Sequence, residues 1–149
     1  MNILLVEDDD IKASSIESFI ENKINKINKI NRKKSWQTGL IEIISNRKYD
    51  LILLDMSMPR YDYDGSDNSY EFEPFAGWEI MKEMKRRKII VNTIVITSFG
   101  TFGKDDNRID VNVLNSNLKS EFINFYKGLV KYNSSMVTWK EELEDILKL

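Results

Sequence analysis

Apolar runs and helix-like segments alternate along the chain. Three runs are apolar through most of their length and end at a polar residue, at 2–6, 50–55 and 92–97. A strand that is apolar at consecutive positions, instead of at every second one, is typical of a parallel sheet with helices on both faces. The pattern therefore predicts an α/β fold built on a five-stranded, doubly wound parallel sheet.

Weaker patterns predict the remaining elements. Two further strands are expected at 30–36, on the edge of the sheet, and at 111–114. Helical spacing of apolar residues predicts helices within 11–27, 39–44, 77–88, 122–130 and 136–147. We expect one domain over 1–132, with an inserted loop at 60–76, and an additional amphipathic C-terminal helix within 133–149.

The composition narrows the chemistry. The 149 residues are 42% hydrophobic and 31% charged with a net charge of -2, an ordinary balance for one globular domain. The chain has no Cys and no His, which excludes disulfides, thiolate catalysis, a histidine base and a phosphohistidine. Because it shows no membrane-length apolar run, signal peptide or broad basic excess, we expect a cytoplasmic protein without direct contacts to membrane or nucleic acid.

Acidic and hydroxyl residues follow three of the predicted strands. Glu7 and Asp8 follow the first strand, and Asp55 ends the run at 50–55. Thr97 and Ser98 end the run at 92–97. The carboxyl ends of parallel strands meet at one edge of a sheet, so we expect these side chains to share a pocket. Carboxylates so placed repel one another unless a cation joins them, and oxygen ligands favour Mg²⁺.

Three segments also carry a family resemblance. They are Ile-Leu-Leu-Val-Glu-Asp-Asp at 3–9, Asp-Leu-Ile-Leu-Leu-Asp-Met-Ser-Met-Pro at 50–59, and Ile-Val-Ile-Thr-Ser at 94–98. In order and spacing they resemble the receiver domains of two-component response regulators over about 1–132. The resemblance implies a flavodoxin-like signalling module, not a metabolic enzyme. Such a module accepts a phosphoryl group from a histidine kinase or phosphotransfer protein with Mg²⁺ and switches its contacts with an output protein.

The resemblance also implies a role for each residue of the pocket. Asp55 resembles the phosphoacceptor, and Glu7, Asp8, Asp55 and the backbone carbonyl of Ser57 resemble the metal ligands. Thr97 resembles the switch hydroxyl, and Ser98 stands where the family has a small residue that gives the phosphate access.

Two departures concern the end of the predicted fifth strand. The family has a Lys there, preceded on the same strand by an aromatic residue. With the strand at 111–114, these positions fall on Asn115 and Val113. A neutral amide stabilises a phosphoryl group less than an ammonium does, by about 1–2 kcal/mol. Lys119 or Lys104 are possible substitutes.

A third departure is an insertion of about fourteen residues after Pro59. The glycine that normally follows soon after this proline matches Gly77 here. The inserted segment is rich in acids and aromatics, including Tyr61, Asp62, Tyr63, Asp64, Asp67, Tyr70, Glu71, Phe72, Glu73 and Phe75. Long loops beside a site often act as lids or binding surfaces, and an insertion without function is the alternative.

Two other functions remain open at this stage. A pseudo-receiver would keep the fold as a protein-interaction module without cycling through phosphorylation, as the residues at 113 and 115 suggest. A metal-dependent phosphohydrolase or nuclease would pair Glu7 with Asp62 and Asp64. The dehalogenase type of phosphatase needs a second acid two residues after Asp55, where this chain has Ser57.

Overall fold

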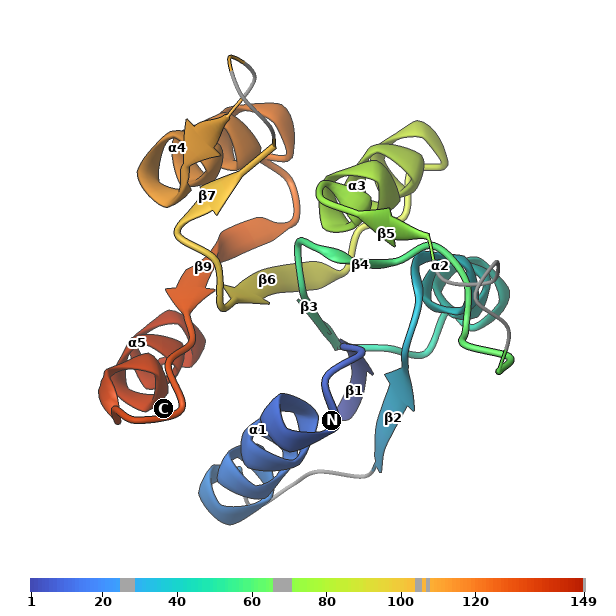
Figure 1. The fold of residues 1–149 in the computed structure, drawn as a ribbon. Helices are drawn as coiled ribbons and strands as arrows, with labels where there is room; N and C mark the ends of the chain where they lie inside the picture. The colour runs from blue at the N-terminus through green and yellow to red at the C-terminus, as the bar shows by residue number, and fades with distance from the viewer. Residues whose placement is uncertain (25–28, 66–70, 104–105, 107, 149) are drawn as a thin grey trace.

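A five-stranded parallel sheet forms the centre of the protein (Figure 1). The computed structural model describes residues 1–24, 29–65, 71–103, 106 and 108–148. The sheet has the order β2-β1-β3-β6-β9, and its strands are β1 (Asn2–Val6), β2 (Lys29–Lys33), β3 (Leu51–Leu54), β6 (Asn92–Thr97) and β9 (Tyr126–Lys131). The predicted five-stranded, doubly wound α/β fold is therefore confirmed.

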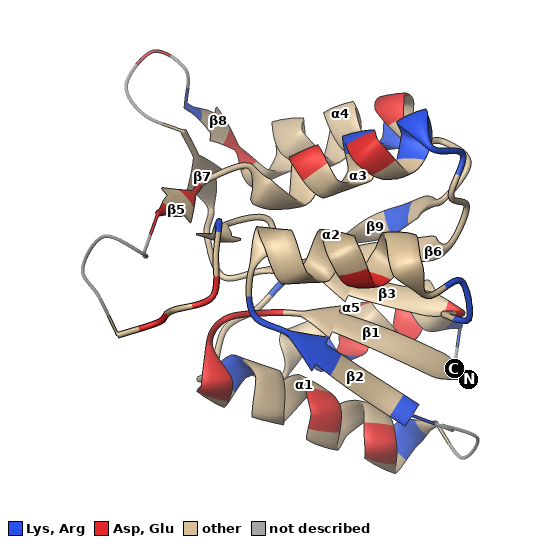
Figure 2. Ribbon diagram, turned by 90° about the vertical axis from the view of Figure 1, so that its right-hand side faces the viewer, with Lys and Arg blue, Asp and Glu red and all other residues tan. Residues whose placement is uncertain are grey.

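Two short antiparallel ribbons lie outside this sheet. β4 (Met58–Pro59) pairs with β5 (Phe72–Glu73), and β7 (Thr101–Phe102) pairs with β8 (Ile109–Asp110). Both ribbons follow strands whose carboxyl ends carry the predicted site. They therefore stand beside that edge of the sheet (Figure 2).

Helices cover both faces of the sheet, as Figure 2 shows edge-on. The helices are α1 (Asp10–Lys23), α2 (Trp36–Ser45), α3 (Ala76–Arg86), α4 (Val111–Glu121) and α5 (Thr138–Leu147). α1 and α5 lie on one face, and α2, α3 and α4 lie on the other. In the described part of the chain, none of these helices has the length and apolar character needed to cross a bilayer.

The alternation of side chains along β1 explains why its sequence is apolar throughout. Leu4 and Val6 belong to the core under α2–α4, while Ile3 and Leu5 belong to the core under α1 and α5. All four side chains are 2% exposed or less. Because both faces are covered, neither set of alternate positions can be polar.

The strand predicted at 111–114 is wrong, because these residues form the first turn of α4. Asp110 caps this helix by accepting a hydrogen bond from the Val113 N–H, and Leu114 and Leu118 are its buried residues. Their spacing of four is helical. The prediction followed the apolar pair at 111 and 113, although the residue at 113 is exposed.

The helix predicted at 122–130 is also wrong, because α4 ends at Glu121, residues 122–125 form a turn and the rest belongs to β9. Burial alternates along this strand, as it does when one face is more covered than the other. Gly128 has a φ of 153°, and a side chain there would meet Ile146 of α5 at 3.0 Å. A glycine is thus needed at the point where α5 approaches the strand.

The predicted C-terminal helix is present as α5 and packs against α1. The rings of Phe19 and Trp139 meet edge to face with centroids 5.4 Å apart, and Lys23 pairs with Glu144 at 3.0 Å. Trp139 and Leu143 are buried in the same core as β1. α5 therefore covers the sheet together with α1.

Candidate functional site

Three carboxylates meet where β1 and β3 end. β1 and β3 are adjacent and parallel, and the N–H of Asp55 donates to the carbonyl of Val6 at 3.1 Å. Glu7, Asp8 and Asp55 each offer an oxygen within 4.8 Å of the others. Among the described residues, this is the group of acids whose spacing could hold a metal ion. Glu7 is 1% exposed and Asp55 is 5% exposed.

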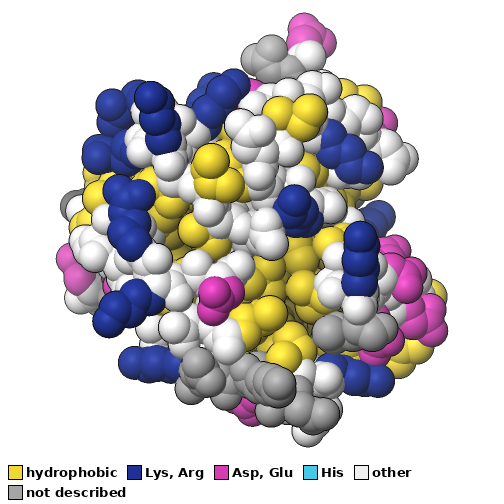
Figure 3. Space-filling view, turned by 180° about the vertical axis from the view of Figure 1, so that it is seen from behind, with side chains coloured by type: hydrophobic (Ala, Val, Ile, Leu, Met, Phe, Trp, Pro, Cys, Tyr) yellow, Lys and Arg dark blue, Asp and Glu magenta, His cyan; other side chains and the backbone are white. Residues whose placement is uncertain are grey.

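These carboxylates line a pocket of about 150 Å³ at the carboxyl edge of the sheet. Its other lining residues come from α1, from the loop after β3, from the insertion and from the end of β6: Asp9, Lys12, Ser57, Phe72, Ser98 and Phe99. Figure 2 shows acidic residues gathered at the end of β1. Lys and Arg side chains stand out on the opposite side of the molecule (Figure 3). The acidic residues at the end of β1 attract a cation to this edge of the sheet.

Burial sets the ionisation of the group. It raises the pKa of Glu7 to about 7, and the charge of Asp55 adds to this effect while Lys12 opposes it. Burial and the charge of Glu7 raise the pKa of Asp8 to about 6. Burial also raises the pKa of Asp55, against the attraction of Lys12. Burial thus disfavours the charged forms of these carboxylates, and a bound cation would favour them again.

Backbone contacts hold the Asp55 carboxylate in place. The N–H of Met56 donates to its Oδ1 at 2.8 Å, and the N–H of Gly77 donates to the Met56 carbonyl at 2.9 Å. A Cβ at Gly77 would lie 2.5 Å from the Asp55 carbonyl oxygen, so α3 can start this close only with glycine there. The Ser57 hydroxyl donates to the Pro74 carbonyl at 2.8 Å, which ties the loop after β3 to the chain that enters α3.

Thr97 and Ser98 lie at the end of β6, as predicted, in different environments. Thr97 is fully buried, and its hydroxyl oxygen accepts a hydrogen bond from the Phe99 N–H at 3.3 Å. Ser98 is exposed and lines the pocket. The structure thus brings Ser98 to the carboxylates, and places Thr97 behind it in contact with Phe99.

The lysine at the end of the fifth strand is Lys131, which corrects the assignment of Asn115. Lys131 ends β9 and is paired in register with Thr97. Asn115 belongs to α4, where its side-chain oxygen accepts a hydrogen bond from the Tyr126 hydroxyl at 2.7 Å. Of the suggested substitutes, Lys119 is exposed in the last turn of α4. Lys104 lies outside the described residues.

The fifth strand still differs from the family pattern in one respect. The three residues before Lys131 are Gly128, Leu129 and Val130, so the family's aromatic residue is missing from this part of the strand. Val113, where it was expected, is an exposed residue of α4.

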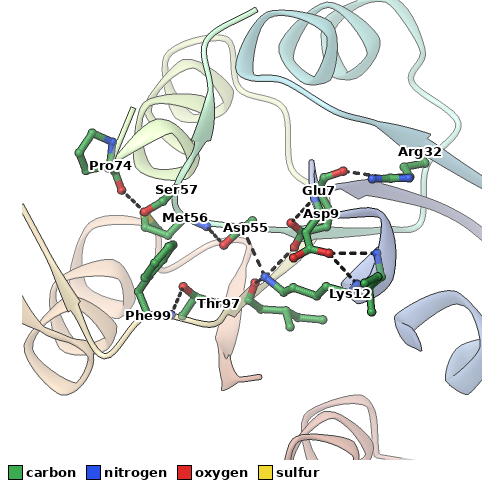
Figure 4. A network of polar contacts seen from close by, with 12 residues as sticks. Glu7, Asp9, Lys12, Arg32, Asp55, Met56, Ser57, Pro74, Thr97 and Phe99 are labelled. Atoms are coloured by element: carbon green, nitrogen blue, oxygen red, sulfur yellow. Dashed lines mark hydrogen bonds and ion pairs between the residues drawn. The ribbon is translucent and has the colours of Figure 1, made fainter. Parts of the chain in front are cut away.

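Lys12 is a pocket residue that the sequence analysis missed. Its ammonium lies 2.6 Å from Glu7 Oε1 and 3.4 Å from Asp55 Oδ2, and it donates to the Ile96 carbonyl at 2.9 Å (Figure 4). A signal was present in the sequence. Lys12 stands four residues before Ile16, on the stripe of α1 that faces the core.

The described part of the insertion is anchored beside the pocket. Arg60 pairs with Glu73 at 3.3 Å and stacks over the Trp36 ring at 4.7 Å, and Asp62 accepts a hydrogen bond from the Thr38 hydroxyl at 3.1 Å. Asp62 thus faces α2 and is outside the carboxylate group. The predicted insertion residues Asp67 and Tyr70 lie outside the described residues.

Two aromatic residues form one side of the pocket. Phe72, from β5 of the insertion, meets Phe99 edge to face with centroids 6.5 Å apart. Phe99 also contacts Phe102 of β7 at 6.4 Å. The insertion therefore contributes directly to the pocket wall.

Comparison with known structures identifies the architecture. The Francisella response regulator 1452 receiver domain matches with a TM-score of 0.60 and 18% identity, over 99% of this chain and 96% of that one. The phosphorylated cyanobacterial phytochrome response regulator RcpA matches with a TM-score of 0.65 and 14% identity, over 99% and 91%. The chain has the receiver-domain fold. CheY6 from R. sphaeroides, solved in complex with the P1 domain of CheA3, is a further match, with a TM-score of 0.59 and 20% identity over 99% and 93%.

Sequence relatives cover this receiver fold almost from end to end. The Detocs response regulatory protein DtcB of Enterobacter cloacae is 29% identical over 144 residues, 96% of this chain and 95% of that protein. Protein y4jR of Sinorhizobium fredii is 27% identical over 146 residues, with 97% and 95% covered. No protein-family model matches the chain.

Proposed function

We propose that this protein is the phosphoacceptor receiver of a two-component system. Asp55 accepts a phosphoryl group from a histidine kinase or phosphotransfer protein, and the change alters contacts with an output protein. The observation that carries the proposal is the convergence of Glu7, Asp8 and Asp55 on one small pocket at the carboxyl edge of a receiver fold. The relative named as a response regulatory protein supports it.

The donor set fits Mg²⁺. Three carboxylates offer hard oxygen ligands, and the Ser57 carbonyl belongs to the loop directly after Asp55. Glu7, Asp8, Asp55 and this carbonyl would hold the ion. When bound, Mg²⁺ supplies positive charge that offsets the repulsion between a carboxylate and an incoming phosphoryl group.

The residues of the chain prepare Asp55 for transfer. The Met56 N–H orients the carboxylate, and burial keeps water from most of its surface. The transfer forms a bond between an Asp55 oxygen and phosphorus. It breaks the phosphorus–nitrogen bond of the donor's phosphohistidine, whose imidazole leaves. The structure of CheY6 with the P1 domain of CheA3 supports a kinase or phosphotransfer partner for this fold.

The switch would pass from Thr97 through aromatic residues. If the Thr97 hydroxyl turns to a phosphoryl oxygen, it gives up the hydrogen bond from the Phe99 N–H. Phe99 packs on Phe72 and Phe102, so its movement would reach both short ribbons. This route does not need the missing aromatic residue of the fifth strand.

A pseudo-receiver is the second candidate, and one observation favours it. The buried ammonium of Lys12 already neutralises part of the charge on Glu7 and Asp55, as a metal would. A module that only binds partners could keep its pocket closed in this way.

Beryllium fluoride, which mimics a phosphoryl group on a carboxylate, separates the two functions. We expect calorimetry to show saturable binding that requires Mg²⁺ in the native chain and disappears in Asp55→Asn. Absence of binding in the folded native chain at saturating Mg²⁺ would contradict the phosphoacceptor function and leave the pseudo-receiver. Circular dichroism of both proteins is the control for folding.

A further inference from the structure

Lys12 is a buried cation whose partners come from three different strands. Glu7 follows β1, Asp55 follows β3, and the Ile96 carbonyl belongs to β6 (Figure 4). An ammonium group has three hydrogens, and these three acceptors satisfy them. The side chain is 3% exposed, a level of burial that lysine tolerates only when it is paired.

The ammonium occupies oxygens that a metal ion would use. Glu7 and Asp55 both belong to the group with metal-binding spacing, and both contact Lys12. Two cations on the same oxygens repel each other. A bound ion must therefore displace the ammonium or share the carboxylate oxygens with it. Because Lys12 is tethered to α1, a displaced ammonium stays beside the pocket that it lines.

Lys131 stands in a different environment. Its side chain is exposed and its ammonium lies beside Gly100. The distance from this ammonium to the position that a Cβ would take at Gly100 is 3.3 Å. Within the part of the chain that the structure describes, Lys131 makes no ion pair with the pocket carboxylates, whereas Lys12 pairs with two of them. The two lysines therefore form a natural comparison.

We propose that Lys12 is the principal phosphoryl-binding lysine of this protein. It pairs with Asp55 in the resting state and bonds to a phosphoryl oxygen after transfer. It thus takes the part that the resemblance gives to the lysine at the end of the fifth strand. The proposal rests on the phosphoacceptor function proposed above. It has a second consequence that is independent of phosphorylation, since Lys12 must weaken the binding of Mg²⁺.

The test compares Lys12→Met with the matched variant Lys131→Met. Methionine keeps an unbranched side chain of similar length and removes the charge. In calorimetry we expect Lys12→Met to bind Mg²⁺ about ten-fold more tightly and beryllium fluoride, at saturating Mg²⁺, about ten-fold more weakly. Lys131→Met should stay within about two-fold of the native chain in both titrations. An equal or larger loss of beryllium fluoride binding in Lys131→Met, or unchanged binding in Lys12→Met, overturns the proposal.

A measurement on the native chain covers the case in which Lys12→Met does not fold. In protein labelled with ¹³C-lysine, the Cε signal of Lys12 should shift when Mg²⁺ is added and again with beryllium fluoride. A static Lys12 signal together with a shifting Lys131 signal overturns the proposal. If the native chain binds Mg²⁺ but not beryllium fluoride, the phosphoacceptor function itself fails. If the native chain binds both and only the variant comparison fails, the role of Lys12 alone is refuted.

Discussion

The stability of the metal-free protein should fall as the pH rises from about 4.5 to 7, because of Glu7. Its pKa is raised from an ordinary 4.5 to about 7 by burial and by the charge of Asp55. Between these values the folded protein keeps a proton on Glu7 that the unfolded chain has lost. The contribution of Glu7 to the free energy of unfolding is therefore fully present below the unfolded pKa. It is lost progressively as the pH rises through the folded pKa.

The size of the effect follows from the two pKa values. At 1.36 kcal/mol per pKa unit, the change from 4.5 to about 7 corresponds to roughly 3 kcal/mol. Asp8, whose pKa is raised to about 6, acts in the same direction but less, since it is half exposed and screened by solvent. For a protein of this size, roughly 3 kcal/mol is a large part of the expected 5–15 kcal/mol of stability.

Urea unfolding measured by tryptophan fluorescence at pH 5, 6, 7 and 8 is the assay. With EDTA, the free energy of unfolding should decrease by about 3 kcal/mol from pH 5 to pH 8. The variant Glu7→Gln should have a shallower slope, because its amide does not titrate, while Asp8 and Asp55, whose pKa values are also raised, keep the remainder. Saturating Mg²⁺ should flatten the native profile, because the ion binds the ionised carboxylates. A pH slope that persists unchanged in Glu7→Gln would refute the assignment to this residue.

Three further predictions concern the walls of the site and the C-terminal helix. Gly77→Ala should cost about 2–4 kcal/mol in urea unfolding, because its Cβ would meet a strand-end carbonyl at 2.5 Å. The control Gly100→Ala meets only the end of a flexible lysine at 3.3 Å and should cost less than about 1 kcal/mol. Phe72→Ala opens the pocket wall and should speed dissociation of beryllium fluoride several-fold, whereas Tyr63→Ala, outside the pocket lining, should not. Leu143→Ala should cost about 2–5 kcal/mol, since this side chain of α5 is 0% exposed; a negligible cost would contradict a structural role for the helix.

The wrong strand and helix assignments all concern the chain after Thr97. Strand β9 carries charge at Lys127 and Lys131 and a glycine between them, so it lacks the continuous apolar run of a central strand. β9 lies at the edge of the sheet, where burial alternates. The apolar residues at 111 and 113 resembled a strand more closely. The fifth strand was therefore predicted one element too early in the chain. The lysine of the fifth strand was missed for this reason.

The sequence by itself determined the central strands and the carboxylates at their ends. Strands covered on both faces must be apolar at every position, so β1, β3 and the residues that follow them can be predicted from the sequence. Only the tertiary structure decided which cations reach those carboxylates. Lys12, in the first turn of α1, reaches Asp55 after β3 and the Ile96 carbonyl of β6, and Phe72 reaches the pocket because the insertion folds back on Pro59. Such contacts depend on how separate elements pack together, and the residues along one element do not encode that packing.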